Sequence, residues 1–303
     1  MSMKKITLIA IAFIAMLGES KAQQDPVFSQ YMFNMSAINP AYVGSRDVFS
    51  LTATYRKQWV DLNGAPSTGL VSLDFPIARK NIGIGVSAYT DKVGIFNTTG
   101  GYAQFAYRLR LGKGVLAFGL QAGAYQYTAD WTKVNGQDPN DPAFSSNFNK
   151  ILPNFGFGVY YNTDRWYIGA SAPRLLTNKI NEQSDESVLT RHFYLTAGTV
   201  IGISPSVKLK PSVLLRAVQG GPMSFDVNLN CWIIDRIGIG ASYRYGDGVL
   251  GMLEIQASPR FRIGYAYDMA LTDIRGYSSG THEAMLRYEF GFDKKKVISP
   301  RYF

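Results

Sequence analysis

Residues that could carry out catalysis or bind a metal are few in this chain and poorly spaced for either task. His192 and His282 are the only histidines, and neither has metal-ligand spacing with the other or with Cys231, the single cysteine. No nucleophile-elbow sequence is present that would indicate a Ser–His–Asp hydrolase. The oxygen-rich run Gly136–Pro142 could bind calcium, but it lacks the EF-hand spacing and is typical of turns. We therefore expect no catalytic, cofactor-binding or metal-binding residues, and a protein that is not an enzyme.

Charged side chains instead recur at every second position within apolar segments. Between Met223 and Met269, four runs of about ten residues place apolar side chains on one parity and Gly, Ser or charged side chains on the other. About ten residues is the length with which a tilted β-strand crosses a bilayer. We predict that the charged parity lines the lumen of a membrane-spanning barrel, either as a wet channel or as cross-barrel ion-pair networks. The candidate lumen-lining residues are Arg56, Arg108, Arg110, Lys208, Lys210, Arg216, Asp226, Arg244, Glu254, Arg262, Asp268, Glu283, Arg287 and Glu289.

The alternation predicts about fourteen antiparallel strands, an even number that lets both ends of the barrel wall lie on one side of the membrane. Turns such as Gly112-Lys113 and Thr163-Asp164 are short, whereas the connections Asp130–Pro153 and Pro173–Arg191 are long. In bacterial barrels the short turns face the periplasm. The predicted strands are Asp47–Val60, Ser67–Phe75, Asn81–Thr90, Thr98–Leu111, Gly114–Ala129, Asn154–Asn162, Arg165–Ala172, His192–Ile203, Val207–Val218, the four runs between Met223 and Met269, and Thr281–Phe292.

The composition agrees with an all-β membrane barrel. Aromatic residues make up 14% of the chain, charged residues 17%, and Gly numbers 30, which fits a barrel with aromatic girdles. A mean hydropathy of −0.06 resembles that of a soluble protein, but the two faces of a barrel cancel in this average. A secreted β-sandwich also alternates and is the alternative fold. The net charge of +9 is spread among strands and turns, so nucleic acid is not an indicated partner, and acidic lipid headgroups give a simpler account.

The two ends of the chain carry signals of their own. Lys4 and Lys5 precede an apolar run, and Ser20-Lys21-Ala22 has the small residues of a signal-peptide cleavage site. Asp25-Pro26 is a helix-start pattern, and we expect a short helix at about 26–37 that starts on the periplasmic side and folds into the barrel mouth or along its rim. The predicted domains are a signal peptide at 1–22, an N-terminal periplasmic or plug segment at 23–46, an outer-membrane barrel at 47–293 and a periplasmic tail at 294–303.

The segment before the first strand carries a long motif with family specificity. Asp25–Asn34 (DPVFSQYMFN) followed by Asn39–Gly44 (NPAYVG) closely resembles the opening of the PorP/SprF family of outer-membrane proteins. Tyr55–Trp59 followed by Gly64-Ala65-Pro66 is similar to that family's first strand and loop, and Ser299–Phe303 is similar to its ending. The likeness spans essentially the whole mature chain. The motif residues that are candidates for plug or partner-docking contacts are Asp25, Pro26, Phe28, Gln30, Tyr31, Asn39, Pro40 and Tyr42.

The resemblance implies a non-enzymatic component of the type IX secretion system and of gliding motility. Its implied partners are outer-membrane lipids, periplasmic ring and lipoprotein subunits of the machine, and client proteins with a C-terminal signal domain, such as surface adhesins. The barrel would dock the ring subunits and help to export or anchor the clients. The alternative function is a passive porin or a fatty-acid-type transport channel, in which the N-terminal segment would be a hatch.

Overall fold

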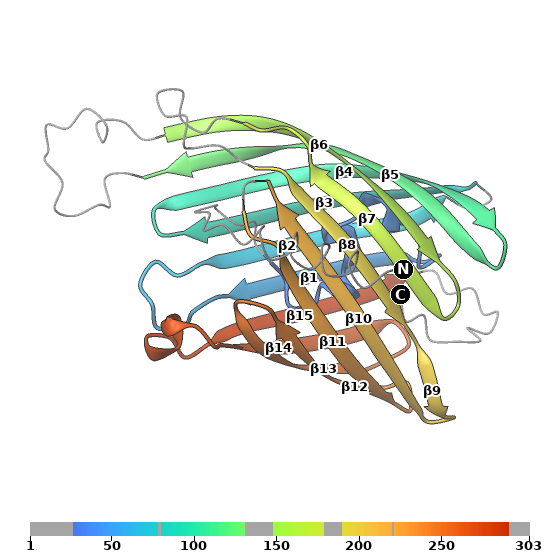
Figure 1. The fold of residues 1–303 in the computed structure, drawn as a ribbon. Helices are drawn as coiled ribbons and strands as arrows, with labels where there is room; N and C mark the ends of the chain where they lie inside the picture. The colour runs from blue at the N-terminus through green and yellow to red at the C-terminus, as the bar shows by residue number, and fades with distance from the viewer. Residues whose placement is uncertain (1–26, 78–79, 131–147, 179–189, 220, 291–303) are drawn as a thin grey trace, which may run out of the picture.

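A closed antiparallel β-barrel of fourteen strands forms the molecule in the computed structural model (Figure 1), which confirms the predicted fold. The structure describes residues 27–77, 80–130, 148–178, 190–219 and 221–290. The first and last strands, β1 (Phe49–Lys57) and β15 (Thr281–Phe290), pair with Arg56 opposite Glu283. The other strands are β2 (Ser67–Ile77), β3 (Ile82–Val93), β4 (Phe96–Leu111), β5 (Gly114–Ala129), β6 (Phe148–Asn162), β7 (Trp166–Arg174), β8 (His192–Thr199), β9 (Ile201–Ser204), β10 (Val207–Val218), β11 (Ser224–Ile233), β12 (Ile237–Arg244), β13 (Gly248–Gln256) and β14 (Phe261–Ala270).

Most strands match the predicted bounds to within three residues, and two differ more. The strand expected at 192–203 is divided at Val200 into β8 and β9, which both pair with β10, so fifteen labels describe fourteen strands. β6 begins at Phe148 rather than at Asn154, because residues 148–153 pair with the end of β5. Pro153 and the polar pair Asn149-Lys150 resemble a loop in the sequence, and pairing with the neighbouring strand overrides that local signal.

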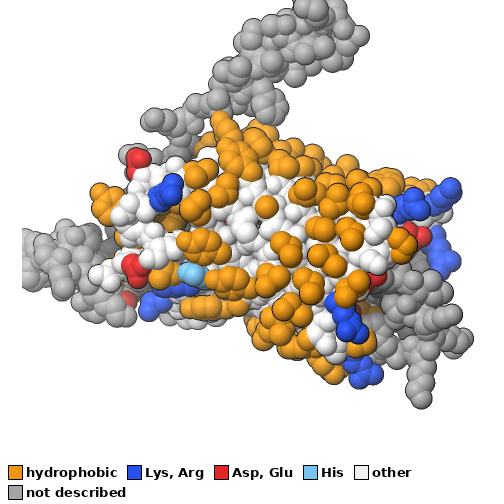
Figure 2. Space-filling model, turned by 90° about the horizontal axis from the view of Figure 1, so that it is seen from below, with side chains coloured by type: hydrophobic (Ala, Val, Ile, Leu, Met, Phe, Trp, Pro, Cys, Tyr) orange, Lys and Arg blue, Asp and Glu red, His pale blue; other side chains and the backbone are white. Residues whose placement is uncertain are grey.

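The outward side of the wall is apolar, as a surface that faces lipid must be. Along β1, Tyr55 is 56% exposed, whereas its neighbours Thr54 and Arg56 are buried inside the barrel. Phe105 and Leu120 are exposed in the same way on β4 and β5. Figure 2 shows hydrophobic side chains in a broad band over the wall, with charged side chains near its two ends. In the part of the chain that the structure describes, no helix is long and apolar enough to cross a membrane.

Residues 27–46, the luminal segment, lie inside the barrel and contain three short 3₁₀ turns instead of the helix predicted at 26–37. Asn39 does not end a helix but begins the third turn, since its side-chain oxygen accepts the amide of Ala41 at 2.9 Å and Pro40 occupies the first turn position. The segment follows the irregular inner wall, and short turns allow it to change direction where a helix would not. The turns are η1 (Tyr31–Phe33), η2 (Met35–Ala37) and η3 (Pro40–Tyr42), and a fourth, η6 (Asp273–Gly276), lies between β14 and β15.

The luminal segment runs through the barrel from one end to the other. The long-loop end carries the connections after β1, β3, β5 and β7, and the short-turn end carries those after β2, β4 and β6. Val27 lies with Trp59 and Asp247 at the long-loop end, whereas Arg46 pairs with Glu289 near the short-turn end. The segment therefore does not start at the short-turn end, where we expected it. Its link to β1 fixes only where it finishes, and twenty residues suffice to cross the lumen.

Candidate functional site

Glycines on the inner wall make room for the luminal segment. A Cβ on Gly119 of β5 would lie 2.1 Å from the amide nitrogen of Ala41, and one on Gly83 of β3 would lie 2.0 Å from the carbonyl oxygen of Val43. A Cβ on Gly158 of β6 would meet the Asn39 side chain at 2.1 Å. Only glycine permits such close approach of a second backbone. The wall is therefore shaped to hold this segment in one position.

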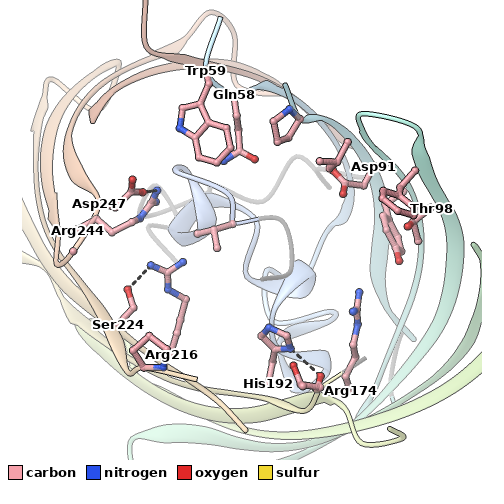
Figure 3. A pocket seen from close by; sticks show the side chains of 18 of the residues that line it. Gln58, Trp59, Asp91, Thr98, Arg174, His192, Arg216, Ser224, Arg244 and Asp247 are labelled. Atoms are coloured by element: carbon pink, nitrogen blue, oxygen red, sulfur yellow. Dashed lines mark hydrogen bonds and ion pairs between the residues drawn. The ribbon is translucent and has the colours of Figure 1, made fainter. Parts of the chain in front are cut away.

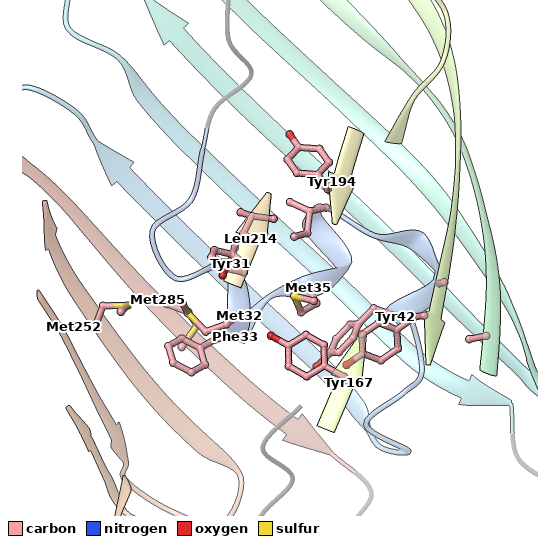
Figure 4. Packing of buried hydrophobic residues seen from close by; sticks show 14 of the residues in the cluster. Tyr31, Met32, Phe33, Met35, Tyr42, Tyr167, Tyr194, Leu214, Met252 and Met285 are labelled. Atoms are coloured by element: carbon pink, nitrogen blue, oxygen red, sulfur yellow. The ribbon is translucent and has the colours of Figure 1, made fainter. Parts of the chain in front are cut away.

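An apolar cluster spans the lumen at the level of these turns (Figure 4). Tyr31, Phe33 and Met35 of the luminal segment are buried, and the Tyr42 ring packs edge-on against Tyr160 with centroids 5.4 Å apart. The segment contacts strands on several sides of the barrel, so it occupies the cross-section of the lumen. The wall residues in the cluster are Ala117, Tyr160, Tyr167, Tyr194, Leu214, Met252, Ala266 and Met285.

Buried ion pairs hold the start of the luminal segment where the first strand, β1, meets the last strand, β15. Arg56 lies 2.7 Å from Asp268 and 3.2 Å from Glu283, and all three side chains are at least nine-tenths buried. The Glu283 carboxylate also accepts the backbone amides of Ser29 at 2.7 Å and Gln30 at 2.8 Å. The hydroxyl of Ser29 donates to Asp268 at 2.6 Å. Strands β1, β14 and β15 are thus tied together through the segment that they enclose.

A second set of contacts holds the other end of the segment. Arg46 and Glu289 form a buried ion pair at 2.5 Å, and the amide of Gly44 donates to Asp74 at 3.0 Å. In the middle, the Lys210 ammonium lies 5.3 Å from the centroid of the Phe33 ring. Both ends of the segment are therefore fixed because buried carboxylates of the barrel wall bind groups of the segment.

The candidate lumen-lining residues all lie on the inward parity, and most of them form ion pairs with one another or with a neighbouring carboxylate. Arg216 and Arg244 share the carboxylate of Asp226, at 2.9 Å and 3.1 Å. Arg108 and Arg110 lie at the short-turn rim, where Lys208 also pairs with Asp235 at 2.8 Å. The buried candidates are Arg56, Lys210, Arg216, Asp226, Arg244, Glu254, Arg262, Asp268, Glu283, Arg287 and Glu289.

The motif residues are mostly internal. Asp25 and Pro26 lie outside the described residues, and Phe28 is half-buried. Gln30, Tyr31, Asn39, Pro40 and Tyr42 are buried within the barrel, so their contacts are with the wall. Sequence reasoning missed Ser29, Arg46 and Asp74. Asp74 was detectable, because it stands between Leu73 and Phe75 on the inward parity of β2.

A cup of about 630 Å³ opens at the long-loop end, a size typical of binding sites (Figure 3). Arg174 lies over the Tyr125 ring at 4.5 Å on one side of the cup. Trp59 lies on another side with a φ of 44°, a left-handed conformation uncommon for a bulky residue. Its amide donates to the Thr281 hydroxyl at 3.1 Å, which fixes the loop after β1 to the start of β15. Such backbone strain clusters at ligand-binding sites, so the cup is a candidate docking site.

The histidines are not brought together in a catalytic arrangement. The Nδ1 atom of His192 lies 3.1 Å from the Thr190 carbonyl oxygen, and His282 lies 2.5 Å from the Tyr265 hydroxyl on the outer wall. Among the described residues, no three His, Cys, Asp or Glu side chains form a group that could hold a metal ion. The oxygen-rich run Gly136–Pro142 lies outside the described residues.

A closed wall with an apolar outer band and a charged interior defines a β-barrel protein of the bacterial outer membrane. The chain belongs to the PorP/SprF family, because the model described as "Type IX secretion system membrane protein PorP/SprF" matches residues 20–288. No curated protein matches the sequence.

Solved structures with similarity to the chain include other outer-membrane proteins. Omp33 of Acinetobacter baumannii is 10% identical, with a TM-score of 0.43 over 80% of this chain and 98% of that one. A TodX deltaS2S3 mutant, described as a monoaromatic hydrocarbon channel, is 9% identical, with a TM-score of 0.46 over 88% of this chain and 95% of that one. Outer membrane phospholipase A from Escherichia coli is 10% identical, with a TM-score of 0.38 over 88% of this chain and 99% of that one.

Proposed function

We propose that this barrel is a plugged, non-enzymatic docking component of the type IX secretion system. Its long-loop end faces the cell exterior and holds a client protein that carries a C-terminal signal domain. Its short-turn end faces the periplasm and docks ring or lipoprotein subunits of the machine. The barrel wall anchors both contacts in the outer membrane.

The observation that carries this proposal is the occupied lumen. The luminal segment is buried between strands on several sides and is fixed near both ends by ion pairs or hydrogen bonds to carboxylates. A passive channel needs an open path, and removing this segment would leave the buried Glu289 without the Arg46 guanidinium that now neutralises it. Family membership supports a role in secretion, and the cup supports a binding surface at the long-loop end. The proposal is therefore preferred to a porin or a fatty-acid-type channel.

Purification of the full chain from its native membrane tests the proposal directly. We expect periplasmic ring or lipoprotein subunits and a client C-terminal signal domain to co-purify with the barrel. A deletion strain should lose a surface adhesin or the ability to spread by gliding, while small-solute uptake stays normal. Loss of solute uptake alone, with adhesin display unchanged, would favour the channel function instead.

The direction of the luminal segment gives a prediction that tests the assignment of the two ends. Val27 is partly exposed at the long-loop end, and Lys113 is exposed on a short turn. In a Cys231→Ala background, Val27→Cys is expected to react with a membrane-impermeant maleimide on intact cells. The matched variant Lys113→Cys should react only after the outer membrane is permeabilised. The opposite labelling pattern would show that the barrel has the reverse orientation in the membrane, and it would contradict the proposed docking sites.

A further inference from the structure

The short-turn end carries a ring of positive charge. Each of its six turns has a Lys or Arg at or beside its tip, and in five of the six turns at least one of these is exposed to solvent. The exposed residues, here called the turn cations, are Lys80, Arg110, Lys113, Arg165, Arg236 and Arg260. In the sixth turn the cation is the half-buried Lys208. A charge at every turn distributes the ring around the whole circumference of the barrel.

The described part of the chain leaves the turn cations unneutralised. Arg108 pairs with Asp47 at this end, and Lys208 pairs with Asp235, but none of the turn cations forms an ion pair with a described residue. Asp164 is the remaining exposed acid on these turns. Residues 291–303, which lie outside the described residues, contain one Asp against three Lys and one Arg. The turn cations are therefore available to bind a molecule of opposite charge.

The described residues of the long-loop end do not share this bias. There, exposed cations such as Lys92 and Arg275 are accompanied by the exposed acids Asp61 and Asp273. Figure 2 shows mainly Lys and Arg side chains, with a few Asp and Glu side chains among them, at the end where the short turns lie, and both signs of charge at the other end. Among the residues that the structure describes, the short-turn end thus has the electrostatic character that selects a partner of opposite sign.

The position of the turn cations favours a protein over lipid headgroups as that partner. Headgroups surround the wall, so they would meet side chains on the outward parity next to the turns. Those positions are apolar and exposed, whereas Arg110 lies on the inward parity at the mouth of the barrel and Lys113 lies on the tip of its turn. The apolar outward residues nearest the turns include Leu109, Leu111, Trp166, Ile203, Ile237 and Ile255.

We propose that the turn cations form a docking ring for an acidic protein surface in the periplasm. The inference rests on the proposed function, since it gives the chemistry by which a ring subunit of the secretion machine would recognise the barrel. Exposed ion pairs contribute little individually, so recognition depends on several turns meeting the partner at once. Such contacts raise the association rate, and salt weakens them because their charges are exposed.

Binding of a purified ring lipoprotein of the same secretion system, made without its lipid anchor, tests this inference. The full-length barrel is held in nanodiscs of phosphatidylcholine, which has no net charge. The double variant Lys113→Glu/Arg260→Glu is expected to weaken binding about tenfold at about 50 mM salt, and about 300 mM salt should weaken wild-type binding similarly. The matched variant Lys92→Glu/Arg275→Glu at the long-loop end should bind like wild type.

Two outcomes would overturn the docking ring while leaving the proposed function intact, and a third would overturn the proposed function itself. Tight binding whose affinity changes neither with salt nor in the Lys113→Glu/Arg260→Glu variant would leave the function intact and refute the ring. Retention of phosphatidylglycerol by the wild type but not by the variant, with unchanged subunit binding, would assign the ring to lipid. Absence of any binding, combined with normal adhesin display in a barrel-deletion strain, would refute the proposed function itself.

Discussion

Replacing Arg56 with alanine is expected to lower the free energy of unfolding of the barrel by about 3–5 kcal/mol. The guanidinium neutralises Glu283, whose side chain is fully buried, and Asp268, which is 10% exposed. Without it, two neighbouring carboxylates remain in a low-dielectric interior with one more distant cation, Arg244, 3.6 Å from Asp268. Urea unfolding of the purified barrel in detergent micelles, followed by tryptophan fluorescence, measures the loss.

Arg108→Ala is the matched control for this prediction. The Arg108–Asp47 pair has the same 2.7 Å separation as Arg56–Asp268, but the Asp47 side chain is 56% exposed. Water screens that pair, so its loss should cost only about 0–1 kcal/mol. Equal effects of the two variants would show that burial of the Arg56, Asp268 and Glu283 ion pairs does not add to the stability of the barrel.

The barrel wall could be predicted from the sequence because lipid imposes a strict rule on it. Outward side chains within the lipid-facing band are apolar, so Tyr55, Phe105 and Leu120 alternate with buried inward residues along their strands. The same alternation located the buried charges, including Arg56 and Glu283, on the inward parity. It could not show whether these charges meet water or one another, because parity gives direction and not distance.

The luminal segment and the cup were less predictable for a physical reason. Residues 27–46 lie in the lumen, where no uniform solvent imposes a period, and their turns are set by contacts with distant strands. The close contacts at Gly83 and Gly119 follow from the approach of the segment's backbone, although the sequence signal was present, since inward glycines alternate with outward Ile, Phe and Leu on these strands. Trp59 and Arg174 come together in the cup only once the barrel has closed.

Gly119→Val is expected to displace the luminal segment and open the barrel to ions. The new Cβ would lie 2.1 Å from the Ala41 amide and 2.4 Å from its Cα, and backbone atoms cannot yield as a flexible side chain can. The wall is held by the pairing of β5 with β4 and β6, so the segment must move. We expect a stability loss of about 1–3 kcal/mol from overpacking, together with frequent channel openings in planar bilayers. Wild-type protein should show no sustained openings.

Gly251→Val separates this effect from the general cost of valine in a strand. Gly251 lies on the outward parity of β13, and a Cβ there would meet no atom within 4 Å. That variant should keep both the stability and the closed state of the wild type. If wild-type protein conducts as strongly as Gly119→Val, the segment does not close the lumen and the channel function gains support. If Gly119→Val stays closed and stable, the close contact between Gly119 and the Ala41 backbone is not what holds the segment in place.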